Sequence, residues 1–345
     1  MVFMNNKTQI SFIIPAYNAE DTIESCVNSI LNIKRNDIEV VVVDDGSTDF
    51  TFKICEQIED ERVKVIRKRN GGVSTARNTG IIESAGKFII FCDADDQIEA
   101  KGMEKILSGI NDSDELIMFR VRRVVNGVAK LEKTGISPGI YGKEMLQQLS
   151  MRLLDMPIYR NKSNNYLQGS ACFYIYKREN IIKNNILFRD NLKYAEDLCF
   201  CLEIFKKFNH IKVTNSCGYI INVRENSASR GFRRQFWREL KEVYQVIVEI
   251  TGTENEILYC HFGRAAVNHY LLHMPIKEWQ SAIGEVLEDY PFKTFLKEIL
   301  FPKKTLLEKV FDSSCIHKYY IGFVVYVLCQ KIYFKANEMI ERIRV

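Results

Sequence analysis

The chain places several carboxylates close together directly after an apolar run. Asp93, Asp95 and Asp96 follow Phe88-Ile89-Ile90-Phe91, with Cys92 and Ala94 between them. Several carboxylate oxygens at one strand end suit a hard divalent cation and a phosphorylated ligand. An isolated Asp-x-Asp is more typical of a solvated acidic turn. Further polar clusters elsewhere in the chain favour an active-site rim over that alternative.

Two such clusters follow earlier apolar runs. Residues 10–14 lead into Pro15-Ala16-Tyr17-Asn18, and residues 38–43 lead into Asp44-Asp45-Gly46-Ser47. Unbroken runs of this kind, rich in β-branched residues, indicate strands that are buried on both faces. The carboxyl ends of parallel neighbouring strands meet at one edge of a sheet. We therefore expect the three clusters to converge there.

Helical patterns separate these runs. An apolar stripe over residues 23–31 predicts a helix that either Asn18 or Asp21 caps, and a shorter helix is expected around residues 54–58. Residues 63–66 suggest a strand, and 74–84 a helix whose small residues allow close packing on a sheet. This β-α-β-α-β-α-β order predicts a doubly wound α/β sheet with its ligand crevice outside the carboxyl strand ends.

Two familiar phosphate cradles are absent from the sequence. No Gly-x-Gly-x-x-Gly follows the first strand, and the stretch from Gly80 to Phe88 has the wrong spacing and lacks the Ser or Thr of a phosphate loop. We infer a nucleotide site built from carboxylates, an aromatic ring and a metal ion.

Four successive motifs resemble those of family 2 glycosyltransferases with the GT-A fold, a doubly wound, Rossmann-like mixed sheet. They are Pro15-Ala16-Tyr17-Asn18-Ala19, Val43-Asp44-Asp45-Gly46-Ser47-Thr48-Asp49, Asn70-Gly71-Gly72-Val73-Ser74-Thr75-Ala76-Arg77-Asn78 and Asp93-Ala94-Asp95-Asp96. The match covers roughly the first third of the chain. It is specific because all four motifs occur in order at the spacing of consecutive strands.

This resemblance implies a UDP-sugar donor. Tyr17 would stack on the base, Asp44 and Asp45 would accept the uracil imide N–H, Asp93 would approach the ribose, and Asp95 would bind Mn²⁺ or Mg²⁺. Arg77 and the backbone at Gly71 and Gly72 would add positive potential, although alone they also suit a solvated helix face and an ordinary turn. The residues so assigned to the nucleotide-sugar are Pro15, Tyr17, Asn18, Glu20, Asp44, Asp45, Ser47, Gly72, Ser74, Arg77, Asn78, Asp93, Ala94, Asp95 and Asp96.

Transfer to an acceptor hydroxyl also needs a general base. Asp197 is the candidate because Leu192 to Phe200 resembles the family's Glu-Asp motif at a helix start. The stretch from Gln168 to Asn180, followed by Ile186-Leu187-Phe188, resembles what precedes that motif in non-processive members. Acids in a first helical turn are also favoured by the helix dipole alone. A single base implies inversion of the anomeric configuration. Glu196, Gly169 and Arg224 are expected to contact the substrate.

One departure from the family pattern narrows the function. Processive synthases carry Gln-x-x-Arg-Trp, whereas residues 233–238 read Arg-Arg-Gln-Phe-Trp-Arg, and no long transmembrane run is present. We therefore expect transfer of a single sugar. The nearby basic cluster could close over the diphosphate, receive a phosphorylated acceptor, or form a solvated helix face. Its members are Arg224, Arg230, Arg233, Arg234 and Arg238.

Length and composition suggest a catalytic domain with an appendage. The 345 residues favour a GT-A domain at 1–228, with a nucleotide-sugar half (1–105) and an acceptor half (106–228), followed by a helical domain at 229–345. A net charge of +4 argues against a nucleic-acid binder. Ten cysteines without Cys-x-x-Cys pairs and no signal peptide indicate a reduced, cytoplasmic protein.

The C-terminal region leaves alternatives open. A stripe from Phe236 to Ile247 predicts a helix, and residues 319–329 are apolar but too short to span a bilayer. A second stripe follows at 332–343 among lysines and arginines. This end of the chain suggests a buried core helix, peripheral docking on the inner face of the cell membrane, or a homo-oligomer surface.

The sequence thus predicts an inverting, metal-dependent glycosyltransferase acting in capsular or surface polysaccharide or teichoic-acid-like polymer synthesis. Its acceptor would be a glycan, carried on a lipid or a polymer. One alternative is a sugar nucleotidyltransferase, although the glycine and lysine loop of such enzymes is missing after the first strand. Another is an inactive glycan-binding or scaffold protein, against which Asp95 and Asp197 speak. No pattern indicates which sugar is moved.

Overall fold

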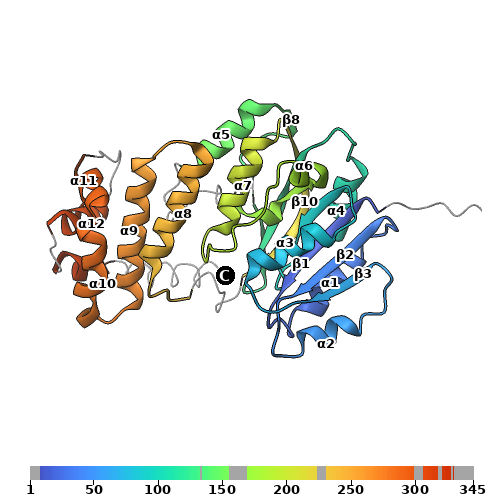
Figure 1. Ribbon diagram of the computed structural model, residues 1–345, viewed down its shortest axis with the longest axis horizontal. Helices are drawn as coiled ribbons and strands as arrows, with labels where there is room; N and C mark the ends of the chain where they lie inside the picture. The colour runs from blue at the N-terminus through green and yellow to red at the C-terminus, as the bar shows by residue number, and fades with distance from the viewer. Residues whose placement is uncertain are drawn as a thin grey trace, which may run out of the picture. The chain divides into compact units, whose positions relative to one another are not determined.

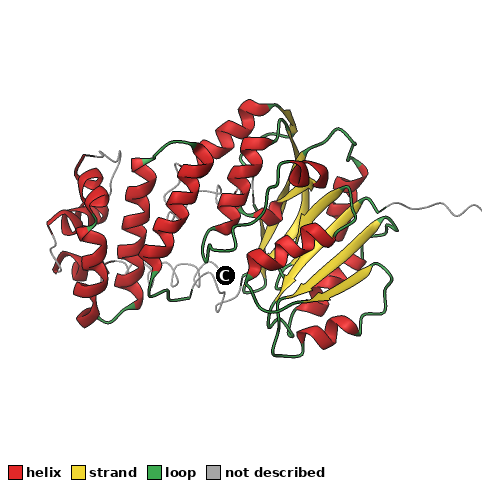
Figure 2. Ribbon diagram, viewed as in Figure 1, coloured by secondary structure: helices red, strands yellow, loops and turns green. Residues whose placement is uncertain are grey.

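The structure is a computed structural model that describes residues 8–132, 134–154, 169–223, 231–298, 306–317, 321–327 and 329. These residues divide into two compact units. The first contains the described residues up to 223 together with 249–251, and the second contains 231–248 and the described residues from 252 onward. A mixed sheet with helices on both faces forms the first unit, and the second is helical (Figures 1 and 2).

The first half of the sheet follows the predicted alternation of strands and helices. Its strands lie side by side in the order β3-β2-β1-β4, and all are parallel. In this register Ala16 lies opposite Asp44 and Ile13 opposite Phe91, so the strands end at one edge. The elements are β1 (Ile10–Ala16), α1 (Ile23–Leu31), β2 (Ile38–Asp44), α2 (Thr51–Glu56), β3 (Val63–Arg67), α3 (Val73–Glu83) and β4 (Phe88–Phe91).

Helix α3 packs closely on the sheet because of Gly80. A Cβ at this position would lie 2.2 Å from Cγ2 of Ile13 on β1, so the helix can approach only without a side chain there. The prediction for the start of α1 was wrong. Thr22 is the N-cap residue and makes no side-chain capping bond. The side-chain oxygen of Asn18 instead accepts the N–H of Thr48.

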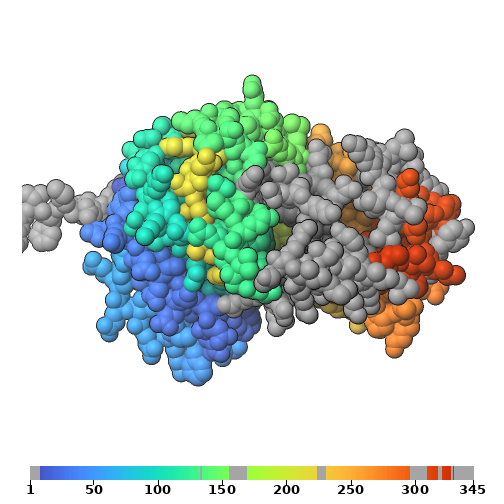
Figure 3. All heavy atoms as spheres, turned by 180° about the vertical axis from the view of Figure 1, so that it is seen from behind, coloured from blue at the N-terminus to red at the C-terminus, as the bar shows by residue number. Residues whose placement is uncertain are grey.

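The second half of the sheet is built from antiparallel and long-range pairings. The order continues from β4 as β9-β6-β10-β5; β9 is antiparallel to both neighbours, and β10 is parallel to β6. Figure 3 shows β10 as a yellow band among the residues of the strands it pairs with. The elements are β5 (Gln97–Ile98), α4 (Ala100–Ser108), β6 (Leu116–Val125), β7 (Val128–Leu131), β8 (Gly139–Tyr141), α5 (Lys143–Leu154), η2 (Ala171–Phe173), β9 (Tyr174–Lys177), α6 (Arg178–Lys183), α7 (Glu196–Lys207) and β10 (Ile211–Asn222).

An aromatic cluster attaches α7 to the sheet. Phe200 of α7 stacks on Phe188 with 4.0 Å between ring centroids, and both rings make T-shaped contacts with Phe91 at the end of β4. Tyr176 of β9 closes the cluster against Phe91 and Phe200. Buried aromatic pairs of this kind add to the stabilisation from burial itself. The cluster therefore fixes the start of α7 near the carboxyl end of β4.

The second unit is helical throughout its described residues. The predicted stripe on α8 is confirmed, since Phe236, Leu240, Val243, Tyr244 and Ile247 are all buried. No helix in the described part of the chain is both long and apolar enough to cross a bilayer. The stripe predicted at 332–343 lies outside the described residues. The elements are α8 (Phe236–Thr251), α9 (Glu256–His273), α10 (Ile276–Glu288), α11 (Tyr290–Glu298) and α12 (Leu306–His317).

Candidate active site

The carboxyl ends of β1, β2 and β4 meet at one edge of the sheet, as the sequence predicts. The backbone N–H of Asp45 donates to the carbonyl of Ala16 over 2.8 Å, and the N–H of Cys92 donates to Ile13 over 2.9 Å. Tyr17, the next residue after β1, is 51% exposed. An aromatic ring at this edge is therefore accessible to a stacking partner.

Three residues that were predicted to bind the sugar donor, Asn18, Glu20 and Ser47, form hydrogen bonds that connect the loop after β1 to the loop after β2. The N–H of Asn18 donates to Oγ of Ser47 over 3.0 Å, and the N–H of Phe50 donates to Oε2 of Glu20 over 2.9 Å. Asn18 adopts a positive φ of 47°, which an asparagine tolerates better than most residues. Pro15 is buried within β1 opposite Val43. Direct contacts of these residues with a nucleotide stay predictions.

Asp44 and Asp45, the paired acids at the end of β2, hold neighbouring segments in place. Oδ1 of Asp45 accepts from Nζ of Lys68 over 2.6 Å, and its two oxygens also accept the N–H groups of Gly71 and Gly72. Asp44 is fully buried, with Oδ2 lying 3.3 Å from Nε of Arg67. A uracil imide would therefore share these carboxylates with donors from the protein, and the predicted base contact remains untested.

Sequence reasoning missed Arg67 and Lys68. The signal that identifies the other clusters was nonetheless available, because the predicted strand at 63–66 leads directly into this basic pair. In the structure β3 ends at Arg67, beside the end of β2, which in turn lies next to β1. The same edge thus carries two cations as well as the acids.

The start of α3 has the features of an anion site. Gly72 precedes the helix with φ 90°, and a Cβ there would meet nothing within 4 Å. Ser74 in the first turn is buried, and within the described residues its hydroxyl has no hydrogen-bond partner. Helix N-termini favour negative charge and offer unpaired N–H groups. The N–H of Gly72 already binds Asp45, and the predicted diphosphate contacts of Gly72 and Ser74 stay predictions.

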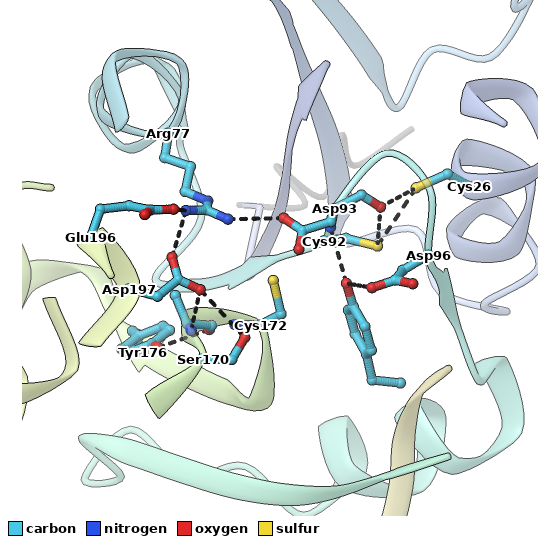
Figure 4. Close-up of polar contacts among 12 residues, drawn as sticks. Cys26, Arg77, Cys92, Asp93, Asp96, Ser170, Cys172, Tyr176, Glu196 and Asp197 are labelled. Atoms are coloured by element: carbon cyan, nitrogen blue, oxygen red, sulfur yellow. Dashed lines mark hydrogen bonds and ion pairs between the residues drawn. The ribbon is translucent and has the colours of Figure 1, made fainter. Parts of the chain in front are cut away.

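Arg77 joins the acids after β4 to those at the start of α7 (Figure 4). Its Nη2 donates to Oδ1 of Asp93 over 2.9 Å. Its Nη1 donates to Oδ1 of Asp197 over 2.5 Å and to Oε1 of Glu196 over 3.2 Å. The side chain of Arg77 is only 4% exposed, whereas that of Asp93 is 38% exposed. Residues that lie far apart in the sequence therefore form one charged cluster.

The ring of Phe188 supports the guanidinium of Arg77, and we call this ring the seat of Arg77. The central carbon of the guanidinium lies 5.1 Å from the ring centroid of Phe188. Asn78, one position after Arg77, exchanges two 2.8 Å hydrogen bonds with the backbone of Phe188, donating to its carbonyl and accepting its N–H. Asn78 was predicted to bind the nucleotide-sugar, and in the structure both polar groups of its side chain are used to hold Phe188. Phe188 lies in the Ile186-Leu187-Phe188 run of the family resemblance, but no role was predicted for it.

The carboxylate of Asp197, the candidate general base, is held by hydrogen bonds on both of its oxygens. Its Oδ2 accepts the N–H of Ala171 over 3.1 Å and the hydroxyl of Ser170 over 3.4 Å. Burial raises the pKa of this carboxyl from 3.8 to about 7; Arg77 opposes the rise, and Glu196 and Asp93 add to it. A carboxyl with a pKa near 7 is well matched to taking up a proton at neutral pH. Ala195, the N-cap residue of α7, has a left-handed backbone conformation with φ 55°.

Asp96 faces away from this cluster, toward β10. Its carboxylate accepts the hydroxyl of Tyr219 over 2.9 Å and the N–H of Asn222 over 2.8 Å. The N–H of Asp93 donates to the same Tyr219 oxygen over 3.0 Å. Burial raises the pKa of Asp96 to about 8. Asp96 and the buried Ala94 therefore anchor the acidic loop, and the predicted donor contacts of both stay untested.

The residues present fit a cation that is shared with a ligand. Asp95 is partly exposed in the loop between Asp93 and Asp96. The described residues contain no group of three His, Cys, Asp or Glu side chains that could enclose a metal. Mg²⁺ is commonly held by one or two carboxylates, substrate phosphates and water. The single predicted ligand, Asp95, is compatible with that mode of binding.

The remaining substrate predictions are partly covered by the structure. A Cβ at Gly169 would lie 3.4 Å from Leu153, an ordinary contact, so packing does not require glycine there. In the basic cluster, Arg233 pairs with Glu239 at 3.0 Å and the exposed Arg238 pairs with Glu242 at 3.3 Å. The exposure of Arg238 on α8 favours the solvated helix-face alternative for that residue, whereas Arg233 precedes the helix and is mostly buried. Arg224 and Arg230 lie outside the described residues.

Comparison with known proteins places this geometry in context. The family model described as Glycosyl transferase family 2 matches residues 11–181. EpsH of Bacillus subtilis strain 168 is 30% identical over 283 residues, which cover 79% of this chain and 78% of EpsH. TarS of Staphylococcus aureus strain Mu50, a poly(ribitol-phosphate) β-N-acetylglucosaminyltransferase, is 26% identical over 302 residues. That alignment covers 82% of this chain and 50% of TarS, so the chain spans half the length of that relative.

The fold is shared with a solved structure. The crystal structure of S. aureus TarS 1–349 in complex with UDP-GlcNAc superposes with a TM-score of 0.64 at 20% identity, covering 95% of this chain and 92% of that one. The predicted fold class, a mixed α/β sheet of the GT-A type, is therefore confirmed.

Proposed function

Because the chain belongs to glycosyltransferase family 2, we propose that it is an inverting enzyme that transfers one sugar from a UDP-sugar to a glycan acceptor. The TarS fragment that shares its fold has been solved with UDP and with UDP-GlcNAc, which supports a UDP-sugar donor. The activity named for TarS supports an acceptor of the teichoic-acid type, or a related surface polysaccharide, carried on a lipid or a polymer.

The observation that carries this proposal is the link from Asp93 through Arg77 to Asp197. Asp93 follows β4, at the strand edge that we assign to the sugar donor, and Asp197 is the candidate base. One guanidinium, that of Arg77, binds the carboxylates of both. Glu196 joins the same guanidinium and is proposed to face the acceptor. A donor-side acid and an acceptor-side base held in one cluster are what direct displacement at a sugar carbon requires.

The proposed reaction is a single displacement. The acceptor hydroxyl oxygen forms a bond to the anomeric carbon while the bond from that carbon to the phosphate oxygen breaks, and UDP departs. The hydroxyl proton passes to the carboxylate of Asp197. With one base and no carboxylate acting as nucleophile, the anomeric configuration inverts, so an α-linked donor gives a β-linked product.

The other proposed roles come from the resemblance to the family. Tyr17, which is exposed, stacks on the uracil base; Asp44 and Asp45 meet its imide; and the start of α3 receives the diphosphate. Mn²⁺ or Mg²⁺ held by Asp95 and the diphosphate would supply Lewis-acid stabilisation of the departing UDP. The donor-site set proposed for the loop after β4 is Asp93, Ala94, Asp95 and Asp96.

The domain organisation is part of the proposal. We assign residues 1–228 to the catalytic domain and 229–345 to a helical domain whose described part is α8 to α12. Docking on the inner face of the cell membrane and self-association remain proposals for this region, beside a buried core helix. Flotation with anionic vesicles tests the first, and light scattering of the full chain tests the second.

The direct test measures UDP release from a panel of UDP-sugars with ribitol-phosphate polymer and other surface glycans as acceptors. Asp197→Asn should reduce turnover by about 10²–10⁴-fold, the usual contribution of a general base, while UDP affinity stays within about twofold. Glu203→Gln is the matched control, because Glu203 lies on the same helix and pairs with Arg189 at 2.8 Å. Near-normal turnover of Asp197→Asn would show that another group is the base.

A further inference from the structure

We propose that Arg77 is the positioning residue of the acceptor base, holding the carboxylate of Asp197 in place, and that it is not a ligand of the donor phosphates. This inference rests on the proposed function, because it concerns how the proposed base is held. It replaces the sequence-based expectation that Arg77 adds positive potential to the diphosphate site.

The first support is that the ends of the guanidinium are already occupied. Nη1 is shared between Asp197 at 2.5 Å and Glu196 at 3.2 Å, and Nη2 binds Asp93 at 2.9 Å. The side chain is 4% exposed. Nε of Arg77 is buried and has no hydrogen-bond partner among the described residues. Because the side chain is so little exposed, the guanidinium offers a phosphate almost no surface to which it could bind.

The second support is the seat beneath the guanidinium. Phe188 lies under Arg77 and stacks on Phe200 of α7, the helix that carries Asp197. Asn78 holds the backbone of Phe188 from the same helix as Arg77. The cation, its ring and its carboxylate partners therefore belong to one packed assembly. An arginine side chain that moves to bind phosphate would not need such support.

The third support is the chemistry of the fork. Arginine presents several N–H groups in a fixed plane, whereas lysine is a point charge on a flexible stem. The planar group here reaches acids from the end of β4 and from the first turn of α7 at once. This geometry fixes the direction of Oδ1 of Asp197, while the N–H of Ala171 fixes Oδ2. The orientation of the base is thus set from two sides.

The charge balance gives the inference a measurable consequence. Burial keeps the nearby thiols and phenol neutral by raising the pKa of each, so Arg77 is the cation among the groups named here. Loss of that cation would leave Asp197 beside two other acids and raise its pKa above about 7. The titratable groups that face Asp197 are Arg77 on α3, Asp93 after β4, Glu196 and Cys201 on α7, Cys172 in η2 and Tyr176 on β9.

The experiment compares Arg77→Gln and Arg77→Lys with the wild type over pH 5.5–9. For Arg77→Gln the acidic limb of kcat should move up by about one pH unit or more, which lowers kcat at pH 7 by about fivefold or more. Arg77→Lys retains the charge but loses the fork, so kcat should fall with a smaller shift of the limb. The affinity for UDP, measured by calorimetry, should stay within twofold for both. Arg189→Gln, which breaks an ion pair with Glu203, is the matched control.

A donor-phosphate role would give the opposite pattern. The Arg77 variants would then weaken UDP binding and raise the KM for the UDP-sugar, with the acidic limb of kcat unchanged, and that result would overturn the inference. If Arg77→Gln does not fold, Phe188→Leu is the second variant, since it keeps every charge and loosens the seat. It should lower kcat and leave UDP affinity intact; unchanged kcat would count against the inference.

A measurement independent of turnover separates this inference from the proposed function. In protein labelled with ¹³C at aspartate side-chain carboxyls, the signal lost in Asp197→Asn identifies Asp197. Its titration midpoint should move to higher pH in Arg77→Gln, or in Arg77→Lys by a smaller amount. If the wild type transfers no sugar but this shift occurs, the proposed function fails and the positioning role stands. An unchanged midpoint refutes the positioning role alone.

Discussion

The two hydrogen bonds of Asn78 allow a test of its role, either as a ligand of the sugar donor or as a residue that holds the protein's own backbone. Its side chain accepts the N–H of Phe188 and donates to the carbonyl of the same residue, each over 2.8 Å. Asn78→Ala removes both bonds. At a net ~0.5–1.5 kcal/mol for each, the free energy of unfolding should fall by about 1–3 kcal/mol. Asn78→Asp keeps the acceptor but turns a carboxylate oxygen toward a carbonyl, so it should be at least as destabilising.

Thermal unfolding and calorimetry with UDP are the assays. For a unit of this size the loss corresponds to a fall in Tm of roughly 3–10 °C. Because Phe188 supports Arg77, kcat should also fall, by about fivefold at pH 7 if the pKa of Asp197 rises by one unit. UDP affinity should not change by more than twofold. Asn184→Ala is the control, since the Asn184 amide makes a local bond to Asn180 within α6.

The opposite outcome would refute this reasoning. If Asn78→Ala leaves Tm unchanged and weakens UDP binding tenfold or more, Asn78 contacts the donor as the sequence motif suggests. If Asn184→Ala lowers Tm equally, the loss is not specific to the Phe188 contact.

Four further predictions follow from the same contacts. Because burial raises the pKa of Asp197 to about 7 and the base must be ionised, kcat should rise with pH to about 7 and then level off; a limb near pH 4 would contradict the assignment. Asp96 has a folded-state pKa of about 8, above its ordinary 3.8, so the folded state holds this proton longer. The Tm should therefore fall as the pH rises from about 4 to 8, and Asp96→Asn should flatten that profile. Asp95→Ala should weaken UDP binding in Mn²⁺ but not in EDTA, and calorimetry that shows equal loss in both would exclude a metal role. Gly80→Ala should cost about 1–3 kcal/mol by overpacking on Ile13, and urea titration should show that the loss is less than additive in combination with Ile13→Ala.

The parallel half of the fold could be predicted from the sequence because its signals are local. Each strand is an unbroken apolar run, and each helix between them has its own stripe or spacing of small residues. The second half of the sheet, from β9 to β5, could not be predicted in this way. β9 lies between β4 and β6, although it follows both in the chain, and nothing in the residues 174–177 specifies that position. Strand pairing over such separations depends on the packing of the whole sheet.

The site was predicted as a set of residues but not as a set of contacts. The motifs pointed to Asp45, Arg77 and Asn78 as ligands of a nucleotide-sugar. The structure shows what each holds within the protein: Asp45 the glycine loop, Arg77 the acids, and Asn78 the Phe188 backbone. These partners lie up to 120 positions away in the chain, and residue spacing carries no information about contacts at that range.

The junction of β10 with the acidic loop has a consequence for where the chain can be cut. The family model ends at residue 181, before Asp197 and before the Tyr219 and Asn222 groups that bind Asp96. A fragment that stops there would retain the first four strands, but the loop after β4 would have nothing to close against and Arg77 would lose two of its three acids. The smallest piece able to assemble this site therefore extends at least to Asn222.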